Sequence, residues 1–327
     1  MSSSRLPARA FAVSLNPAID RTLWVGRLRP GHTHAAAGEH RQAGGKGFNV
    51  AAGLRSLGVP VTMAGWLGAD NCGVFEAAFA ERGIADAMTR VPGAVRENVQ
   101  VGETAASQTT SVELPGLALS PADRAAAEAA LTATLQRDLA PGDWCLLTGS
   151  LPPGTDAGLL ERLARAATDR QAWVVVDTGG EVLAELLRRL AGSAQPVLLK
   201  PNRHELEACC GRPLPTVAHV AEAARALARA GVANVLVSLG AEGAVGVSGA
   251  TAWHAAVPPV PVCTTVGAGD AVVAGTVAAL MAGQPFERAA CQGLACAAWR
   301  IQRRTPDLPP PDAVDACVAG LQLLPLP

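Results

Sequence analysis

The sequence predicts an α/β fold in which helices cover both faces of a mostly parallel sheet. Short apolar runs alternate along the chain with longer segments whose apolar residues recur at helical spacing. Glycine or proline closes most of these segments, and no long linker or fixed-period repeat interrupts the alternation. The 327 residues therefore fit a single large domain with a substantial core.

The first half of the chain gives clear boundaries for its elements. Residues 11–15 are an apolar run closed by Asn16-Pro17, which predicts a strand that enters a turn. Helical spacing over residues 48–57 ends at Gly58, a typical C-cap, and Ser120-Pro121 supplies an N-cap and a first-turn proline. The same criteria predict strands at residues 61–66 and 144–147, and helices at residues 73–82, 121–139 and 158–167.

The second half continues the alternation. Residues 173–176 are consecutive apolar residues and predict a strand buried on both faces. Residues 244–247 and 251–254 predict a hairpin, and Gly267 begins a long helix that reaches residue 281. A proline-rich connector at 306–311 leads to one last short helix. The other expected elements are strands at 197–199 and 235–239, and helices at 182–190, 203–210, 217–230 and 286–301.

Two segments, at about residues 21–42 and 92–116, do not fit this alternation. Both have partly polar patterns that favour β-structure, and neither carries a helix signal. We therefore expect them to form a small extra sheet, which would serve as a lid beside the main domain.

Charge and hydropathy exclude several classes of function. The 27 basic and 28 acidic side chains give a net charge of −1, which offers no electrostatic basis for binding nucleic acid or an acidic membrane. The longest uncharged stretch, residues 243–269, contains prolines and turn residues and predicts strands rather than a spanning helix. The apolar run at 11–15 ends too early for a signal peptide, so we expect a cytoplasmic protein.

The motif Gly267-Ala268-Gly269-Asp270 predicts an anion site at the start of a helix. Glycines at such a turn leave backbone N–H groups free, and the helix dipole adds positive potential. A phosphoryl group in transfer is one such anion, and Asp270 would lie beside it. The alternative is that Asp270 is only a charge partner of the helix N-terminus. The motif is not a Rossmann fingerprint, because Val272 replaces the third glycine.

The two lysines of the chain, Lys46 and Lys200, both fall inside motifs. Lys46 stands in Gly44-Gly45-Lys46-Gly47, which is not a P-loop because glycine rather than serine or threonine follows the lysine. A glycine turn with an embedded lysine before a helix suits a sugar or a phosphate, and a plain flexible turn is the alternative.

Lys200 begins the motif Lys200-Pro201-Asn202-Arg203-His204-Glu205. Asn202 and Glu205 have the spacing of a helix-capping pair. The functional alternative is hydrated Mg²⁺, which keeps several waters and uses few protein oxygens.

Two other patterns are discounted. Asp177-Thr178-Gly179 resembles an aspartic-protease motif, but these enzymes need two such carboxylates and the chain has no second copy. His32 and His34 share a face of a strand without a further metal ligand, so we interpret them as surface histidines.

Six motifs occur together in one order, and this order resembles the PfkB (ribokinase-like) family of carbohydrate kinases. The resemblance covers residues 10–301 and is closest to the branch of 1-phosphofructokinases and tagatose-6-phosphate kinases. The motifs are residues 16–20, 43–49, 148–154, 200–205, 237–244 and 265–270.

The resemblance implies a three-layer α/β domain with a β lid over the sugar site. It also implies ATP, Mg²⁺ and transfer of the γ-phosphoryl group to a phosphoketose, and a homodimer formed through the lid. Fructose 1-phosphate is the expected substrate, giving fructose 1,6-bisphosphate. Tagatose 6-phosphate and fructose 6-phosphate are alternatives within the family, and a non-catalytic sugar-phosphate sensor is a remote one.

The resemblance also assigns roles by position. Asp270 matches the general base, and Gly267, Ala268 and Gly269 match the anion hole. The residues that match sugar and sugar-phosphate contacts are Asp20, Gly44, Gly45, Lys46, Asn49, Arg96 and Ser150, with Lys46 and Arg96 on the phosphate that the substrate already carries. Ser238, Gly240, Gly243 and Thr265 match the nucleotide site, and Asn202 and Glu205 match a motif that binds the metal through water.

Three departures from the family pattern concern specificity. Val95 stands where the family often has threonine, and His32 and His34 lie where some relatives carry basic phosphate contacts. Residues 302–305, near the expected adenine end, are unusual for the family. The first two departures affect the choice of sugar phosphate and the third affects the choice of nucleotide.

Overall fold

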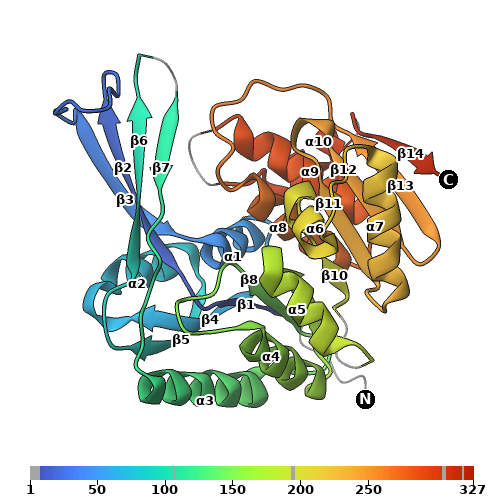
Figure 1. Ribbon diagram of the computed structural model, residues 1–327, viewed down its shortest axis with the longest axis horizontal. Helices are drawn as coiled ribbons and strands as arrows, with labels where there is room; N and C mark the ends of the chain where they lie inside the picture. Colours follow the sequence, from blue (N-terminus) through green and yellow to red (C-terminus); the bar gives the residue numbers. More distant parts are fainter. Residues whose placement is uncertain (1–7, 106–107, 193–195, 304–306, 319) are drawn as a thin grey trace.

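In the computed structural model, which describes residues 8–105, 108–192, 196–303, 307–318 and 320–327, one large sheet lies between two layers of helices (Figure 1). Its strands are β1 (Ala10–Ser14), β4 (Val61–Gly68), β5 (Ala85–Val91), β8 (Trp144–Thr148), β9 (Trp173–Asp177), β10 (Leu198–Leu199), β11 (Asn234–Ser238), β12 (Ala244–Ser248), β13 (Thr251–Ala256) and β14 (Gln322–Leu326). Their order is β14-β13-β12-β11-β10-β9-β8-β1-β4-β5. The strands from β11 to β5 are parallel, and β12, β13 and β14 continue the sheet in antiparallel fashion.

Each face of the sheet buries its own group of helices. One face carries α3 (Pro121–Asp138), α4 (Ala157–Asp169), α5 (Gly180–Leu190), α6 (Arg203–Cys210) and α7 (Val217–Arg229). The other carries α1 (Lys46–Ser56), α2 (Gly73–Arg82), α8 (Ala268–Met281) and α9 (Phe286–Ile301), and α10 (Pro311–Val318) packs on α9. Two short 3₁₀ turns, η1 (Ala69–Asn71) and η2 (Gly240–Glu242), complete the elements. In the described part of the chain, no helix combines the length and the hydropathy needed to cross a membrane.

Side-chain alternation along the strands explains the two cores. In β9, Val174 and Val176 pack into the core under α3 to α7, whereas Val175 packs into the core under α1, α2, α8 and α9. A parallel strand in the middle of an α/β sheet has to be apolar on both faces. The predicted three-layer α/β architecture is therefore confirmed.

A second, four-stranded sheet projects from the main body (Figure 1). It consists of β2 (Ala18–Val25), β3 (Gly38–Gly44), β6 (Arg96–Glu103) and β7 (Thr109–Val112), in the order β3-β2-β6-β7. β2 and β6 are parallel and far apart in sequence, with Ala18 opposite Arg96. Both segments that lacked a helix signal thus contribute strands to one small sheet.

Three features of the large sheet differ from the expectation, two at its edges and one in the central strand β9. β5 and β14 were not expected, because their exposed faces carry polar or proline residues, including Pro325 in β14. Proline is tolerated on an edge strand, where one side of the ladder has no partner. Trp173 is 51% exposed, so the expected burial on both faces begins only at Val174. Part of the expected connector at 306–311 lies outside the described residues.

Two glycines let α8 and α9 pack very closely. A Cβ at Gly275 would lie 2.8 Å from the Cα of Gly293, and a Cβ at Gly293 would lie 2.2 Å from Oγ1 of Thr276. The two helices are antiparallel neighbours along the chain, so the C-terminal end of α9 lies beside the N-terminal end of α8 (Figure 1). This contact fixes the start of α8 relative to the end of α9.

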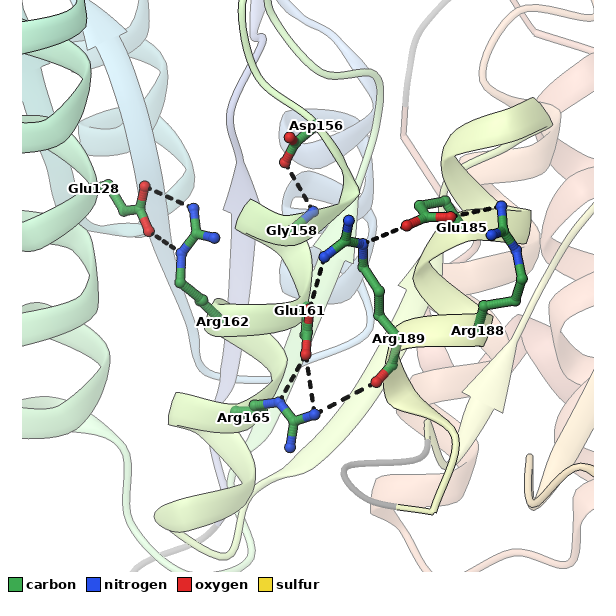
Figure 2. A network of polar contacts seen from close by, with 9 residues as sticks. All are labelled: Glu128, Asp156, Gly158, Glu161, Arg162, Arg165, Glu185, Arg188 and Arg189. Atoms are coloured by element: carbon green, nitrogen blue, oxygen red, sulfur yellow. Dashed lines mark hydrogen bonds and ion pairs between the residues drawn. The ribbon is translucent and has the colours of Figure 1, made fainter.

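Ion pairs join α3, α4 and α5 on the outer surface of the molecule (Figure 2). Glu128 of α3 pairs with Arg162 of α4, and Glu161 of α4 binds both Arg165 of its own helix and Arg189 of α5. The arginines are about half exposed and the two carboxylates are partly exposed, so each pair contributes at most about 1 kcal/mol to stability. The residues of this network do not line the cleft discussed below.

Candidate active site

A cleft of about 990 Å³ lies where the C-terminal ends of the parallel strands face the four-stranded sheet. Ser14, Asp177 and Ser238, which end β1, β9 and β11, line it from the main sheet. Asp20 and Asn98 line it from β2 and β6. Ligands of open α/β sheets bind outside the carboxyl ends of the strands, so this cleft is the candidate site.

The first turn of α8 places a buried carboxylate in the cleft. Gly267 caps the helix with φ of 79°, a left-handed conformation that suits glycine, and Asp270 follows in the first turn with 6% of its surface exposed. Asn49 of α1 donates from Nδ2 to Oδ2 of Asp270 at 2.7 Å. Burial, reinforced by the charge of Asp177, raises the pKa of Asp270 to about 6. This is a suitable pKa for a general base near neutral pH.

Two lysines share one buried carboxylate beside Asp270. Asp177 is completely buried, and its Oδ1 lies 3.2 Å from Nζ of Lys200 and 3.6 Å from Nζ of Lys46. Lys46 Nζ also lies 3.6 Å from Oε1 of Glu205. Burial opposes the charge of Lys46, but the carboxylates of Asp177, Glu205 and Asp270 outweigh it and raise the pKa of Lys46. Lys46 therefore stays protonated at the floor of the cleft, within a cluster whose carboxylates compensate its charge.

Asp20 is held by a glycine turn and by the small sheet. Asn98 donates from Nδ2 to Oδ1 of Asp20 at 3.2 Å, and burial raises the pKa of Asp20. A Cβ at Gly44 would lie only 2.2 Å from Oδ2 of Asp20, so this approach requires glycine. Gly45 follows with φ of 85° and precedes α1. The glycine turn thus brings the backbone and the carboxylate together.

Arg96 and Asn16 tie the two sheets together at the same end of the cleft. Arg96 donates from Nη1 to the carbonyl of Leu114 at 2.8 Å and from Nη2 to the carbonyl of Asn16 at 3.3 Å. Asn16 donates from Nδ2 to Oγ of Ser150 at 3.1 Å. Burial lowers the pKa of Arg96, but guanidinium keeps its charge at any physiological pH. Arg96 can therefore offer a cation to an anionic group in the cleft.

Asn202 and Glu205 form a reciprocal capping box at the start of α6. Glu205 N donates to Oδ1 of Asn202, and Asn202 N donates to Oε2 of Glu205, both at 2.8 Å. The capping interpretation of this pair is confirmed. Oε1 of Glu205 takes no part in the capping box and faces Lys46. Asn202 and Glu205 both line the cleft. Over the described residues, no group of three or more His, Cys, Asp or Glu side chains could hold a metal directly.

The expected nucleotide residues lie after β11 and before α8. Ser238 and Gly240 line the cleft, and Ser238 pairs with Asn202 across a single β-bridge. Gly243 has φ of 88°, and a Cβ there would lie 1.9 Å from the carbonyl oxygen of Ala255, so its glycine serves the backbone turn. Thr265 is exposed two residues before Gly267.

The sequence matches the pfkB family of carbohydrate kinases over residues 13–313. The chain belongs to this family. This pfkB kinase is 41% identical to the 1-phosphofructokinase of Rhodobacter capsulatus, over 98% of each chain. It is 34% identical to the 1-phosphofructokinase of Escherichia coli K12, over 97% of this chain and 98% of the relative. The crystal structure of phosphofructokinase-2 from Escherichia coli in complex with fructose-6-phosphate is similar with a TM-score of 0.86 and 26% identity, covering 95% of this chain and 98% of that one.

Most of the site residues expected from the sequence meet in the cleft of this pfkB kinase. The residues that line it are Asp20, Gly45, Lys46, Asn49, Arg96, Ser150, Asn202, Glu205, Ser238, Gly240, Gly267, Gly269 and Asp270. Gly44, Gly243, Thr265 and Ala268 are adjacent in sequence or support the backbone without lining it.

Sequence reasoning missed three polar residues of this pfkB kinase. Asp177 was considered only as part of a protease motif, Lys200 was noted without a role, and Asn98 was not singled out. Asp177 and Lys200 each follow an apolar run that forms a strand, and the carboxyl ends of parallel strands meet at one edge. Asn98 lies two residues after Arg96 on one strand, so both side chains point to the same face. These two signals were available in the sequence.

Proposed function

We propose that this kinase transfers the γ-phosphoryl group of ATP to fructose 1-phosphate and gives fructose 1,6-bisphosphate. The observation that carries the proposal is a buried carboxylate, Asp270, in the first turn of α8, where the helix N-terminus adds positive potential. The 1-phosphofructokinases to which it is similar span nearly its full length, which supports fructose 1-phosphate over tagatose 6-phosphate or fructose 6-phosphate. A non-catalytic sensor would need neither feature at α8.

In this proposal Asp270 accepts the proton of the attacking sugar hydroxyl. A hydroxyl is a weak nucleophile, and a carboxylate positioned by Asn49 makes it a better one as the new O–P bond forms. The N–H groups of Gly267 and Gly269 would stabilise charge on the phosphoryl oxygens, whereas the N–H of Ala268 already donates to the carbonyl of Thr265 at 3.2 Å. The proton ends on Asp270, and the leaving group is ADP.

The substrate's own phosphate would bind at the end of the cleft where Arg96 lies. The nearby carboxylate of Asp20 favours the protonated, charged form of Arg96. Asp20, Gly44, Gly45, Asn49 and Ser150 would hold the sugar hydroxyls. Lys46 stays a candidate for the same phosphate. Its contacts with Glu205 and Asp177 support a second role, at the phosphoryl group in transfer.

The nucleotide would lie over Ser238, Gly240, Gly243 and Thr265. Asn202 and Glu205 fit Mg²⁺ held through water, because Oε1 of Glu205 is left outside the capping box and faces the cleft. When bound, Mg²⁺ would offset the charge of the β- and γ-phosphate oxygens. The four-stranded sheet would serve as a lid that excludes water.

A homodimer through this lid is part of the proposal. Val112 and Leu114 are 54% and 44% exposed at the edge of the small sheet, and a second copy would cover them. ATP as cosubstrate supports the cytoplasm as the place of action.

Replacing Glu205 by glutamine is expected to raise the Mg²⁺ concentration for half-maximal rate severalfold. The neutral amide keeps a hydrogen-bond acceptor for the cap but attracts metal-bound water less strongly. The helix cap itself contributes about 1 kcal/mol, so the melting temperature should fall only slightly. The measurement is a Mg²⁺ titration of the rate beside a melting curve. Glu207→Gln, on the same helix and outside the cleft, is the control. An unmoved Mg²⁺ curve would leave capping as the only role of Glu205.

The direct test of the proposed function measures ADP formation with ATP, Mg²⁺ and each phosphoketose in turn. We expect kcat/KM for fructose 1-phosphate to exceed that for fructose 6-phosphate and tagatose 6-phosphate by at least tenfold. A preference for fructose 6-phosphate or tagatose 6-phosphate would make that compound the substrate in place of fructose 1-phosphate. No turnover with any phosphoketose would reject the kinase proposal.

A further inference from the structure

A buried arginine lies directly behind the start of α8. Arg300, the penultimate residue of α9, has 8% of its surface exposed. The space that a Cβ at Gly267 would occupy is 3.3 Å from Nε of Arg300 and 3.7 Å from Nη2. Any side chain at Gly267 would therefore meet the guanidinium as well as strain the backbone. Gly267 is needed here both for its φ angle and for this approach.

The position of the guanidinium is fixed by its surroundings. Nη1 of Arg300 donates to the carbonyl of Arg303 at 2.7 Å. The carbonyl of Ile301 accepts from the backbone N–H of Cys263 at 2.7 Å and of Thr264 at 3.2 Å, which fastens the chain leading into Gly267 to the end of α9. The close packing of α8 on α9 at the two glycines described above makes this arrangement rigid. Arg300 is thus preorganised relative to the helix start.

The charge of Arg300 is only distantly balanced. Among the residues that the structure describes, no carboxylate lies within ion-pair distance of its guanidinium. Burial lowers the pKa of Arg300, while Asp270 and Asp307 favour its charged form from further away. Arginine keeps its proton even when buried. A buried cation without a close counter-ion is costly, and an anion arriving at Gly267 would reduce that cost.

We propose that Arg300 is a positioning residue that holds Gly267 from behind and supplies fixed positive potential to the N–H groups at the start of α8. This inference rests on the proposed function, because the anion concerned is the phosphoryl group in transfer. In the transition state the charge is spread over its three equatorial oxygens, and a preorganised cation in a low-dielectric site stabilises that arrangement without reorganising. Arg300 would therefore act on kcat more than on substrate binding.

Two replacements separate charge from shape. Arg300→Gln keeps a donor for the carbonyl of Arg303 and loses the charge, whereas Arg300→Lys keeps the charge. We expect Arg300→Gln to lower kcat by about 10- to 100-fold, with both KM values within threefold of the wild type. Arg300→Lys should lower kcat by less than fivefold. Arg288→Gln, on the same helix and paired with Asp315 at the surface, is the control and should leave kcat unchanged.

A binding measurement provides a readout that does not depend on turnover. ADP with aluminium fluoride mimics the planar phosphoryl group, and calorimetry should show it binding Arg300→Gln at least tenfold more weakly than the wild type. ADP alone should bind both proteins equally. If the glutamine variant does not fold, Arg300→Met takes its place in both measurements.

If kcat falls equally in the lysine and glutamine variants, and the melting temperature falls equally too, the inference is overturned and Arg300 has only a structural role. Weaker binding of ADP alone would also overturn it, because the charge would then serve the ground state. A wild-type protein that phosphorylates no phosphoketose would reject the proposed function itself. An active wild type with an equally active Arg300→Gln would reject only the role of Arg300.

Discussion

Replacing Asp270 by asparagine is expected to lower kcat by about 10²- to 10⁴-fold, because the amide cannot accept the proton of the sugar hydroxyl. Asparagine has nearly the same shape, so Asn49 can still contact it and the fold should persist. Steady-state rates with saturating ATP and sugar phosphate measure the effect. A rate within threefold of the wild type would return Asp270 to the role of a charge partner of the helix.

The pH dependence gives a second check on Asp270. The base must be ionised, and burial raises its pKa to about 6. We expect kcat to be level above about pH 7 and to fall nearly tenfold per unit of pH below 6. The variant Asp270→Asn should lose this acid limb from its residual rate. An acid limb that persists unchanged in the variant would assign it to another group.

Replacing Arg96 by methionine is expected to raise KM for the sugar phosphate by about 10- to 100-fold, with KM for ATP nearly unchanged. A charge-assisted hydrogen bond to a phosphate contributes about 1.5–3 kcal/mol, which corresponds to this range. Lys46→Met should also raise KM for the sugar phosphate and should lower kcat in addition, because its ammonium lies beside Glu205 and Asp177. Lys46→Arg should not restore full activity, since a planar guanidinium differs in shape from a point charge.

The control for both variants is Arg21→Met, which removes a cation from the same small sheet. Arg21 pairs with Glu39 and does not line the cleft. It should leave both KM values within twofold of the wild type. A rise in KM for ATP alone in Lys46→Met would place Lys46 with the nucleotide and would leave the substrate's phosphate to Arg96.

The order of strands and helices could be predicted because each central strand is apolar on both faces and most helices have an apolar stripe. Val174 to Val176 in β9 illustrate this, since no solvated face interrupts the run. Edge strands cannot be predicted in this way, because one side of their backbone and one face of their side chains are exposed to water. β5 carries Asp86 and Arg90 in an ion pair with each other, and β14 contains Pro325. Neither looks like a strand from composition alone.

The glycine motifs and Asp270 could be predicted because a helix N-terminus and a tight turn leave local patterns in the sequence. The strand ends place Asp177 and Lys200 at the same sheet edge, but the ion pairs of Asp177 with both lysines could not be predicted, because they join residues 46, 177 and 200 through the packing of three separate segments. Arg300 is a similar case. Its place behind Gly267 follows from the way that α9 packs on α8 and has no local pattern.

The C-terminal strand β14 has a practical consequence for handling the protein. It covers β13 along residues 252–256, and the carbonyl of Leu326 accepts from Nη2 of Arg225 in α7. Removing these last residues would expose unpaired backbone N–H and C=O groups along β13, and such exposed edge strands pair with other chains and promote aggregation. An affinity tag is therefore better attached at the N-terminus. If a truncated version precipitates, the cause to consider first is the exposed edge of β13 rather than damage to the cleft.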